Sequence, residues 1–302
     1  KVFKKYNVKK DLEITLELNP DDFSRDYLTK IKVIGVNRIS LGVQSFDKFD
    51  MKLLNRNHSP TQSIKALDCI SNLYDNFSID LIYGIPYSSM EKWKNNLKIA
   101  LKYESPHLSC YSLTLEPNTA LHYKVNSGDI KLLDEKLVKK QYNYLVEKLE
   151  EKGYRNYEFS SFAIPGHYAI NNSNYWNGKP YIGIGPSAHS YNGKSIRSWN
   201  ISNNIKYVKA IMNNKLPLKK ERLNKNDLYN EFIMSGLRKE EGVSLKKVRS
   251  LFGIRYKEYL KKQLNKHVSN NNIVFNGDLI KISKKARFLT DGLSSDLFLV
   301  ND

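Results

Sequence analysis

The sequence predicts an α/β protein in which a partial parallel β/α barrel is followed by a helical, winged-helix-like module. Through the first half, short apolar runs alternate with helical patterns of about 10–15 residues, which is typical of βαβ units. The alternation stops near Gly153, where a Gly-rich and aromatic-rich stretch begins, and helical patterns return from residue 224 onward. We therefore expect three parts: a barrel part over 1–153, an extension over 154–222 and the module over 223–302.

The barrel part is predicted element by element from its apolar runs and its helix-terminating residues. Ser59 is a suitable N-cap before Pro60, and Gly35 and Gly153 end helical patterns. The expected strands cover residues 14–18, 38–43, 78–83 and 107–113, and the expected helices cover 24–34, 59–73, 89–103 and 134–152.

The C-terminal module is predicted from helical periods over 227–237, 244–252 and 254–267, followed by a β-hairpin and a last helix over 283–297. The hairpin is centred on Asn276-Gly277, a dipeptide that favours a tight turn between strands. Three helices and a hairpin are the parts of a winged-helix-like module.

Composition and cysteine content narrow the class of protein. Hydrophobic residues make up 40% of the chain, charged residues 26%, and no apolar run approaches the ~18 residues of a membrane span. A secretory signal pattern is absent from the start of the sequence. Cys69 and Cys110, each in an apolar setting, form neither a disulfide framework nor a zinc motif. We expect two buried, reduced thiols in a cytoplasmic protein.

The net charge of +18 admits three interpretations. Lysine is spread through a chain that is also rich in Asn, Tyr and Ile, which favours compositional drift. An anionic partner and a nucleic acid are the alternatives. Because no nucleic-acid-binding motif accompanies the lysines, we expect no nucleic-acid partner.

Polar residues interrupt the apolar strands at or near their C-terminal ends: Glu17, Gln44, Asp80 and Thr114. In a β/α barrel, catalytic and binding groups gather at that end of the strands. Structural roles are the alternative, since Asp80 could cap Gly84 or pair with a buried arginine, and Gln44 could satisfy loop backbone groups. Because four polar residues occupy the equivalent place near the ends of their strands, we favour a binding site.

Several ordered motifs resemble the HemW-type radical-SAM heme chaperones, which are close to the oxygen-independent coproporphyrinogen III oxidases. The similarity covers nearly the whole chain. It is carried by Asn-Arg-Ile-Ser-Leu-Gly-Val-Gln-Ser-Phe at 37–46, Asp-Leu-Ile-Tyr-Gly-Ile-Pro at 80–86, Tyr-Ser-Leu-Thr-Leu-Glu-Pro-Asn-Thr at 111–119, Asn-Tyr-Trp at 174–176 and the block 181–191.

The resemblance implies an S-adenosylmethionine site formed by Glu17, Gln44, Arg56, Asp80 and Thr114. Carboxylates can accept from the amino group or the ribose hydroxyls, and the Arg56 fork suits the methionine carboxylate. In the oxidase branch some matching residues contact a second S-adenosylmethionine, so which residue contacts which molecule stays open.

The resemblance also implies a [4Fe–4S] cluster held by a CxxxCxxC motif. The sequence contains no such motif, so we predict no metal-binding residue in this chain. Because Glu17 matches the end of the family's third strand, we expect the first two βα units and the cluster cysteines to precede Lys1.

A heme-associated H-N-x-x-Y segment of the family corresponds here to Asn171-Asn-Ser-Asn-Tyr175, in which Asn171 replaces the histidine. An amide is a poor axial ligand, so Tyr175 and the upstream His167 are the candidate ligands. The implied partners are heme or another acidic tetrapyrrole, and heme-accepting proteins, with membrane-associated acceptors among the candidates.

Three functions follow from the resemblance. The first is a heme chaperone that binds heme and S-adenosylmethionine for heme trafficking. The second is an enzyme, S-adenosylmethionine-dependent coproporphyrinogen III dehydrogenase, and the third is a decayed protein that keeps the fold. The later blocks, 174–176 and 181–191, favour the chaperone; whether the chain is an enzyme stays open.

Overall fold

A computed structural model describes residues 5–8, 11–22 and 24–300. The chain divides into two compact units, Lys1–Tyr168 (unit 1) and Ala169–Asp302 (unit 2). Each unit has its own secondary structure and is described by itself.

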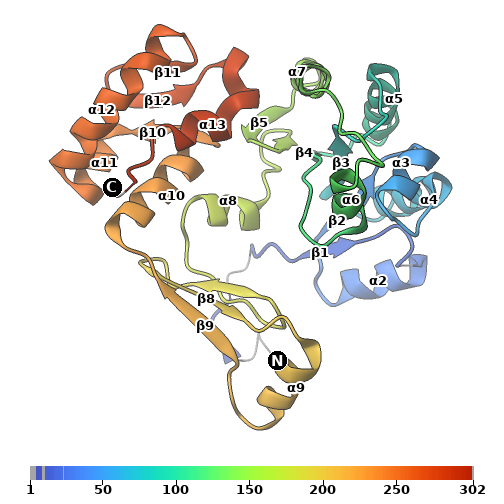
Figure 1. Cartoon of the computed structure of the whole chain (residues 1–302). Coiled ribbons are helices and arrows are strands. Elements are labelled where there is room, and N and C mark those ends of the chain that lie inside the picture. Colours follow the sequence, from blue (N-terminus) through green and yellow to red (C-terminus); the bar gives the residue numbers. More distant parts are fainter. Residues whose placement is uncertain (1–4, 9–10, 23, 301–302) are drawn as a thin grey trace. The chain divides into compact units, whose positions relative to one another are not determined.

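Unit 1 contains a six-stranded sheet whose first four strands are parallel, as the alternating pattern predicted (Figure 1). The two later strands form a hairpin that adds antiparallel to the fourth. The sheet order is β1-β2-β3-β4-β6-β5. The strands are β1 (Thr15–Leu18), β2 (Arg38–Gln44), β3 (Phe77–Tyr83), β4 (His107–Ser112), β5 (Arg155–Glu158) and β6 (Ser161–Ala163).

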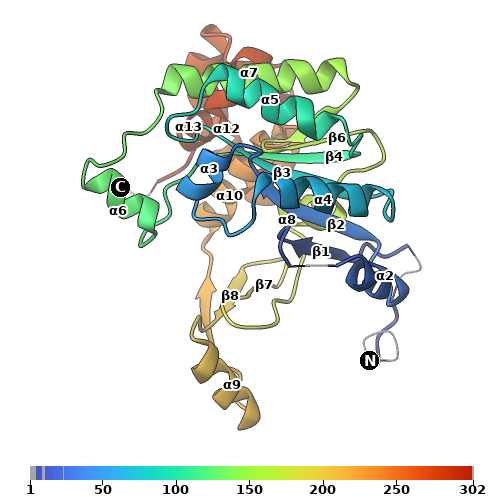
Figure 2. The ribbon, with the colours of Figure 1, turned by 90° about the vertical axis from the view of Figure 1, so that its right-hand side faces the viewer.

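The helices of unit 1 form an outer layer against the parallel strands, as Figures 1 and 2 show for α4, α5 and α7. The two shortest helices, α3 and α6, were not predicted, because six or seven residues do not complete two helical periods. The helices are α2 (Arg25–Val33), α3 (Lys48–Leu53), α4 (Pro60–Ser71), α5 (Met90–Leu101), α6 (Ala120–Asn126) and α7 (Glu135–Glu151).

Side-chain caps fix where the long helices begin. Ser59 accepts from the backbone of Gln62, and the Gln62 side chain accepts in return from the Ser59 backbone, which completes a capping box before Pro60. Ser89 caps α5 by accepting from the backbone of Lys92, and Asp134 caps α7 by accepting from the backbone of Lys136 and Leu137. These caps place the helix starts within one residue of the predicted positions.

Unit 2 begins with a short helix and a three-stranded antiparallel sheet of order β7-β8-β9, none of which the sequence predicted. A helix, α9, connects the second and third strands. These elements are α8 (Ile170–Trp176), β7 (His189–Tyr191), β8 (Ile196–Asn200), α9 (Asn204–Met212) and β9 (Leu218–Arg222).

The rest of unit 2 contains the three predicted helices and the predicted hairpin around one apolar core, in which Tyr229, Ile233 and Leu260 are fully buried. These elements are α10 (Lys225–Leu237), β10 (Val243–Ser244), α11 (Leu245–Phe252), α12 (Ile254–Ser269), β11 (Ile273–Phe275), β12 (Leu279–Ile282), the 3₁₀ helix η1 (Lys284–Leu289) and α13 (Thr290–Ser295).

The predicted single helix over 283–297 is wrong in form, because a 3₁₀ segment is followed by a short α-helix. Gly292, Ser294 and Ser295 lie within the α-helix, and their low helix propensity fits its length of six residues.

The two cysteines differ in their exposure. Both cysteines are free, but only Cys110 is buried; Cys69 lies on α4 with part of its surface exposed, so the expectation of two buried thiols is wrong for that residue. Among the described residues, every helix is too short or too polar to cross a membrane.

Candidate functional site

Three of the predicted binding residues lie where the parallel strands of unit 1 end. Glu17 is the penultimate residue of β1, Gln44 is the last residue of β2, and Thr114 lies two residues beyond β4. Glu17 and Thr114 are exposed, whereas Gln44 is half-buried. The strand-end position predicted for these three residues is confirmed.

The backbone of Gln44 has an unusual conformation, which changes the direction of its side chain. The register between β2 and β3 shifts between Leu41 and Gln44, and the φ angle of Gln44 is +67°, in the left-handed region. Such irregularities re-aim side chains at strand ends and persist only where the surroundings enforce them. A Cβ atom added to Gly42 would lie 2.9 Å from the Gln44 Nε2 atom, so the absence of a side chain at position 42 makes room for this conformation.

Asp80 lies in the middle of β3, next to Ser109 of β4, so the prediction that it lies at the end of its strand is wrong. The physical reason is that β3 continues for three further apolar residues. The Ser40 hydroxyl donates to Asp80 Oδ2 at 3.0 Å, and the Ser78 hydroxyl is 3.1 Å from Oδ1. The backbone N–H of Gly84 donates instead to the Gln141 side chain at 2.9 Å, so Asp80 does not cap Gly84.

The environment of the Asp80 carboxyl favours its protonated, neutral form at mildly acidic pH. Burial raises its pKa from the usual 3.8 to about 6, and the negative charge of Glu17 acts in the same direction. The hydroxyls of Ser109, Ser40 and Ser78 lower the pKa and limit the rise. A carboxyl with such a pKa accepts hydrogen bonds as an anion above that pH and can donate one below it.

A hydrogen-bonded chain connects Asp80 to the beginning of the neighbouring strand. Ser78 Oγ lies 2.8 Å from His107 Nδ1, and His107 Nε2 lies 2.8 Å from the Tyr157 hydroxyl. When Asp80 is ionised and Ser78 donates to it, Ser78 must accept from His107 Nδ1–H, and His107 Nε2 then accepts from Tyr157. The tautomer of His107 follows from this assignment.

His107 is fully buried and stays neutral. Burial first, then the positive charges of the buried Arg38 and of His167, hold the pKa of His107 well below its usual 6.5. The Tyr157 ring stacks on Tyr168 with their centroids 4.3 Å apart. The neutral His107 and the Tyr157 hydroxyl therefore connect to Asp80 through Ser78.

Arg56 lies on the exposed loop between α3 and α4. The buried His58 fixes that loop to the strand end, because its Nε2 atom is 3.2 Å from the Val43 carbonyl oxygen, and its Nδ1 atom is 3.6 Å from Asp21. The loop is thus attached next to Gln44, while the guanidinium of Arg56 itself remains solvent-exposed.

The candidate heme ligands belong to different units. His167 is half-buried near the end of unit 1, and its backbone N–H donates to Ile164 at 3.0 Å. Asn171 and Tyr175 lie on α8 of unit 2. The Tyr175 side chain is 47% exposed, so its hydroxyl is accessible to a ligand, and its ring contacts Tyr181 edge-on at 4.6 Å.

Residues that follow α10 hold the C-terminal end of α8. The Arg238 guanidinium lies 5.3 Å from the centre of the Trp176 ring and binds Asp291 through two hydrogen bonds of 2.7 and 2.8 Å. Lys239 donates to the Asn177 side chain at 2.8 Å. Unit 2 therefore fixes α8 next to its apolar core.

The residues present do not fit an iron–sulfur cluster. Such a cluster needs several cysteines gathered in one loop. Here one thiol lies on α4 and the other is buried in β4, where burial raises the pKa of Cys110 far above its usual value. Over residues 5–8, 11–22 and 24–300, no group of three His, Cys, Asp or Glu side chains is arranged to hold a metal ion.

Sequence reasoning missed the polar residues that surround Asp80: Ser40, Ser78, His107, Ser109 and Tyr157. A pattern was available, because Ser78 and Asp80, and likewise His107 and Ser109, are spaced by two. In a strand, alternate residues lie on one face, so this spacing indicates a polar face inside the sheet.

Two family models match the chain. Residues 1–100 match the Radical SAM superfamily, and residues 223–289 match the HemN C-terminal domain. The curated relatives include heme chaperone HemW of Lactococcus lactis, 32% identical over 87% of this chain and 69% of the relative. Heme chaperone HemW of Buchnera aphidicola (from Schizaphis graminum) is 32% identical over 96% of this chain and 76% of the relative. The E. coli relative of the same name is 39% identical over 59% of this chain and 47% of the relative.

Among solved structures, the coproporphyrinogen III oxidase HemN of E. coli, a radical-SAM enzyme, is similar with a TM-score of 0.81. The match covers 98% of this chain and 72% of that one, at 19% sequence identity. At that identity the likeness establishes the fold.

Proposed function

Since this chain belongs to the HemW family of radical-SAM proteins, we propose that it acts as a heme chaperone, binding heme and passing it to an acceptor. The observation that carries the proposal is the 32% identity to a heme chaperone over 96% of the chain, which includes both units. The proposal places its two ligands at the strand-end face of unit 1, which comprises Glu17, Gln44 and Thr114 together with Asp80 in the middle of β3, and at the accessible Tyr175.

S-adenosylmethionine is the proposed ligand of the strand-end face. Asp80 and Glu17 would accept from its amino group or ribose hydroxyls, and Gln44 can both donate and accept beside them. Arg56 would bind the methionine carboxylate from its loop, and Thr114 would contact the ligand from the end of β4. When bound, the molecule supplies a sulfonium centre whose positive charge the ionised Asp80 would favour.

Heme is the proposed ligand of α8. Tyr175 is the candidate axial ligand of this helix, because a phenolate coordinates iron whereas the Asn171 amide coordinates it poorly. His167 is the second candidate. The basic character of the chain, with a net charge of +18, favours the propionates of heme or of another acidic tetrapyrrole.

The remaining expectations belong to the same proposal: a cytoplasmic location, heme-accepting proteins as partners, and a winged-helix-like arrangement of the module that follows residue 222. The alternative function, coproporphyrinogen III dehydrogenase, is supported by the likeness to HemN, which is a likeness of fold. Because the relatives of higher identity are named as heme chaperones, the chaperone is the better-supported function.

A heme titration of the purified chain tests the proposal. We expect saturable, stoichiometric binding followed by the heme absorption band, and Tyr175→Phe should weaken binding at least fivefold and remove any phenolate-to-iron absorption. Tyr123→Phe, on the exposed surface of α6, is the matched control and should leave the titration unchanged. Absence of saturable heme binding, or conversion of coproporphyrinogen III by the anaerobically purified protein, would overturn the chaperone assignment.

A further inference from the structure

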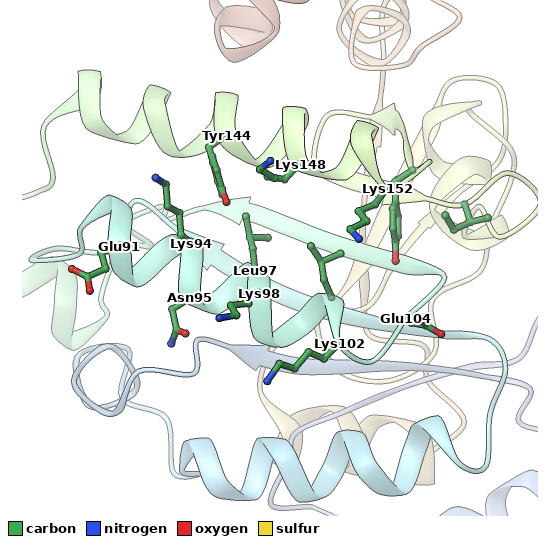
Figure 3. Close-up of a pocket in the computed structure, with 13 residues that line it drawn as sticks. Glu91, Lys94, Asn95, Leu97, Lys98, Lys102, Glu104, Tyr144, Lys148 and Lys152 are labelled. Atoms are coloured by element: carbon green, nitrogen blue, oxygen red, sulfur yellow. The ribbon is translucent and has the colours of Figure 1, made fainter.

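A groove on the outer surface of unit 1 lies between α5 and α7, away from the strand-end face. It encloses about 850 Å³ and is lined by residues of both helices and of the segments that follow them (Figure 3). Its floor is apolar: Leu97 and Tyr154 are almost fully buried beneath it, and the half-buried Leu101 and Ile164 expose apolar surface to it.

Lysines form both rims of the groove. Lys94, Lys98 and Lys102 lie along α5 and its C-cap, and Lys148 and Lys152 lie along α7 and its C-cap (Figure 3). Within each row the spacing is four residues, which brings the side chains to one helix face at intervals of about 6 Å. The lining contains five lysines and two glutamates, so the groove carries an excess of positive charge.

Tyr144 lies between the two rows. The Lys94 ammonium is 5.3 Å from the centre of its ring, and the Lys148 ammonium is 5.9 Å from the same centre. Lys148 also forms an ion pair with Glu151 at 2.6 Å. Two cations, one from each helix, are therefore held near one half-buried ring.

We propose that this groove binds an acidic amphipathic helix of a partner protein. The apolar face of such a helix would lie on the floor, and carboxylates spaced by four residues would match the two lysine rows. Charge complementarity favours an acidic partner. Exposed lysines in a row attract and orient an acidic segment, whereas each adds little to the affinity.

The shape of the groove argues against the other anionic partners. A planar membrane surface cannot reach a floor that lies below two lysine rims. Nucleic-acid sites combine cations with exposed aromatic platforms or with arginines. The residues that line this groove include no arginine, Tyr154 is buried, and the ring of Tyr144 is covered by the ammonium groups of Lys94 and Lys148.

A binding experiment with a defined probe tests the proposal. The probe is a fluorescein-labelled peptide of about 15 residues with glutamates spaced by four on one face and leucines on the other. Its scrambled version has the same composition without the amphipathic pattern. We expect micromolar, salt-dependent binding of the patterned peptide and at least fivefold weaker binding of the scrambled one.

Matched variants locate the binding. Lys98→Glu with Lys148→Glu should weaken binding of the patterned peptide at least tenfold. Lys261→Glu with Lys262→Glu makes the same change of charge on exposed positions of α12 and should weaken it less than twofold. Tyr144→Ala, which keeps the charge, should weaken it about threefold. Circular dichroism melting confirms that each variant is folded.

Equal losses in the two double variants would overturn the proposal, because binding would then depend on net charge alone. Equal binding of the scrambled peptide would overturn it as well. Vesicles containing phosphatidylglycerol provide the remaining comparison. If they bind the protein and the groove variant alone fails to bind them, the occupant is a lipid surface and the proposal is wrong.

Discussion

The strand-end face and the lysine-lined groove of unit 1 both consist of polar side chains, but these side chains differ in their exposure to solvent. On the strand-end face, Asp80, Ser78 and His107 are linked through short hydrogen bonds, and their protonation states follow from burial. In the groove, the lysines are largely exposed and act through their summed charge.

The difference indicates two kinds of recognition. Buried, mutually hydrogen-bonded groups are pre-organised for one small charged molecule, and their arrangement costs stability when that molecule is absent. Exposed rows of cations tolerate many arrangements of a flexible partner and depend on salt.

The largest effect is expected for Asp80→Asn. The folded-state pKa of Asp80 is raised to about 6 from 3.8, so the folded protein binds this proton more tightly than the unfolded chain does. The carboxyl therefore destabilises the fold increasingly as pH rises from about 4 to about 6, and the cost stays constant above about pH 7. Removing it should raise the free energy of unfolding by roughly 2–3 kcal/mol at pH 8 and by little at pH 4.

Urea denaturation of the wild type and of Asp80→Asn at pH 4, 6 and 8 measures this difference. Asp291→Asn is the control, because that carboxylate is exposed and paired with Arg238 in unit 2. A stabilisation by Asp80→Asn that did not grow with pH would contradict the proposed electrostatic cost.

A smaller effect is expected for Tyr157→Phe. Loss of the phenol leaves His107 Nε2 without its donor in a fully buried position, which should destabilise unit 1 by about 1–2 kcal/mol. Thermal melting followed by circular dichroism measures the loss, and Tyr123→Phe at an exposed position should have almost none. An unchanged melting temperature would show that the hydrogen-bonded chain contributes nothing to stability.

The smallest effect is expected for Gly42→Ala. The added methyl group would approach Gln44 Nε2 to 2.9 Å, so the flexible amide must rotate away from its present position. Affinity for S-adenosylmethionine should fall threefold to fivefold, measured by calorimetry, with little change in stability. Gly292→Ala adds a methyl group in open space on α13, and its affinity should equal that of the wild type.

Most of unit 1 was predictable because its signals are local. Strands such as Phe77–Tyr83 are rich in apolar residues, and Ser59 with Pro60 and Gln62 determines the start of α4 without any distant contact. The same is true of the lysine spacing at Lys94 and Lys98, which was present in the sequence but was interpreted as dispersed charge. Its significance depends on α7 lying beside α5, which the spacing alone does not show.

The remainder depends on contacts between distant residues. The position of Asp80 within the polar face requires the parallel pairing of β2, β3 and β4, which brings Ser40 and Ser109 to its sides. The small sheet of unit 2 was not predicted, because the strands His189–Tyr191 and Ile196–Asn200 are short and their polar and aromatic residues do not alternate clearly with apolar ones.

The most direct test of the central claim, that the strand-end face of unit 1 binds S-adenosylmethionine, is the shift in melting temperature that this ligand causes at pH 8 in the wild type and in Asp80→Asn. We predict that the ligand stabilises the wild type in a concentration-dependent way, and that Asp80→Asn melts at a higher temperature without ligand but gains almost nothing from it. An equal ligand-induced shift in both proteins would contradict the claim.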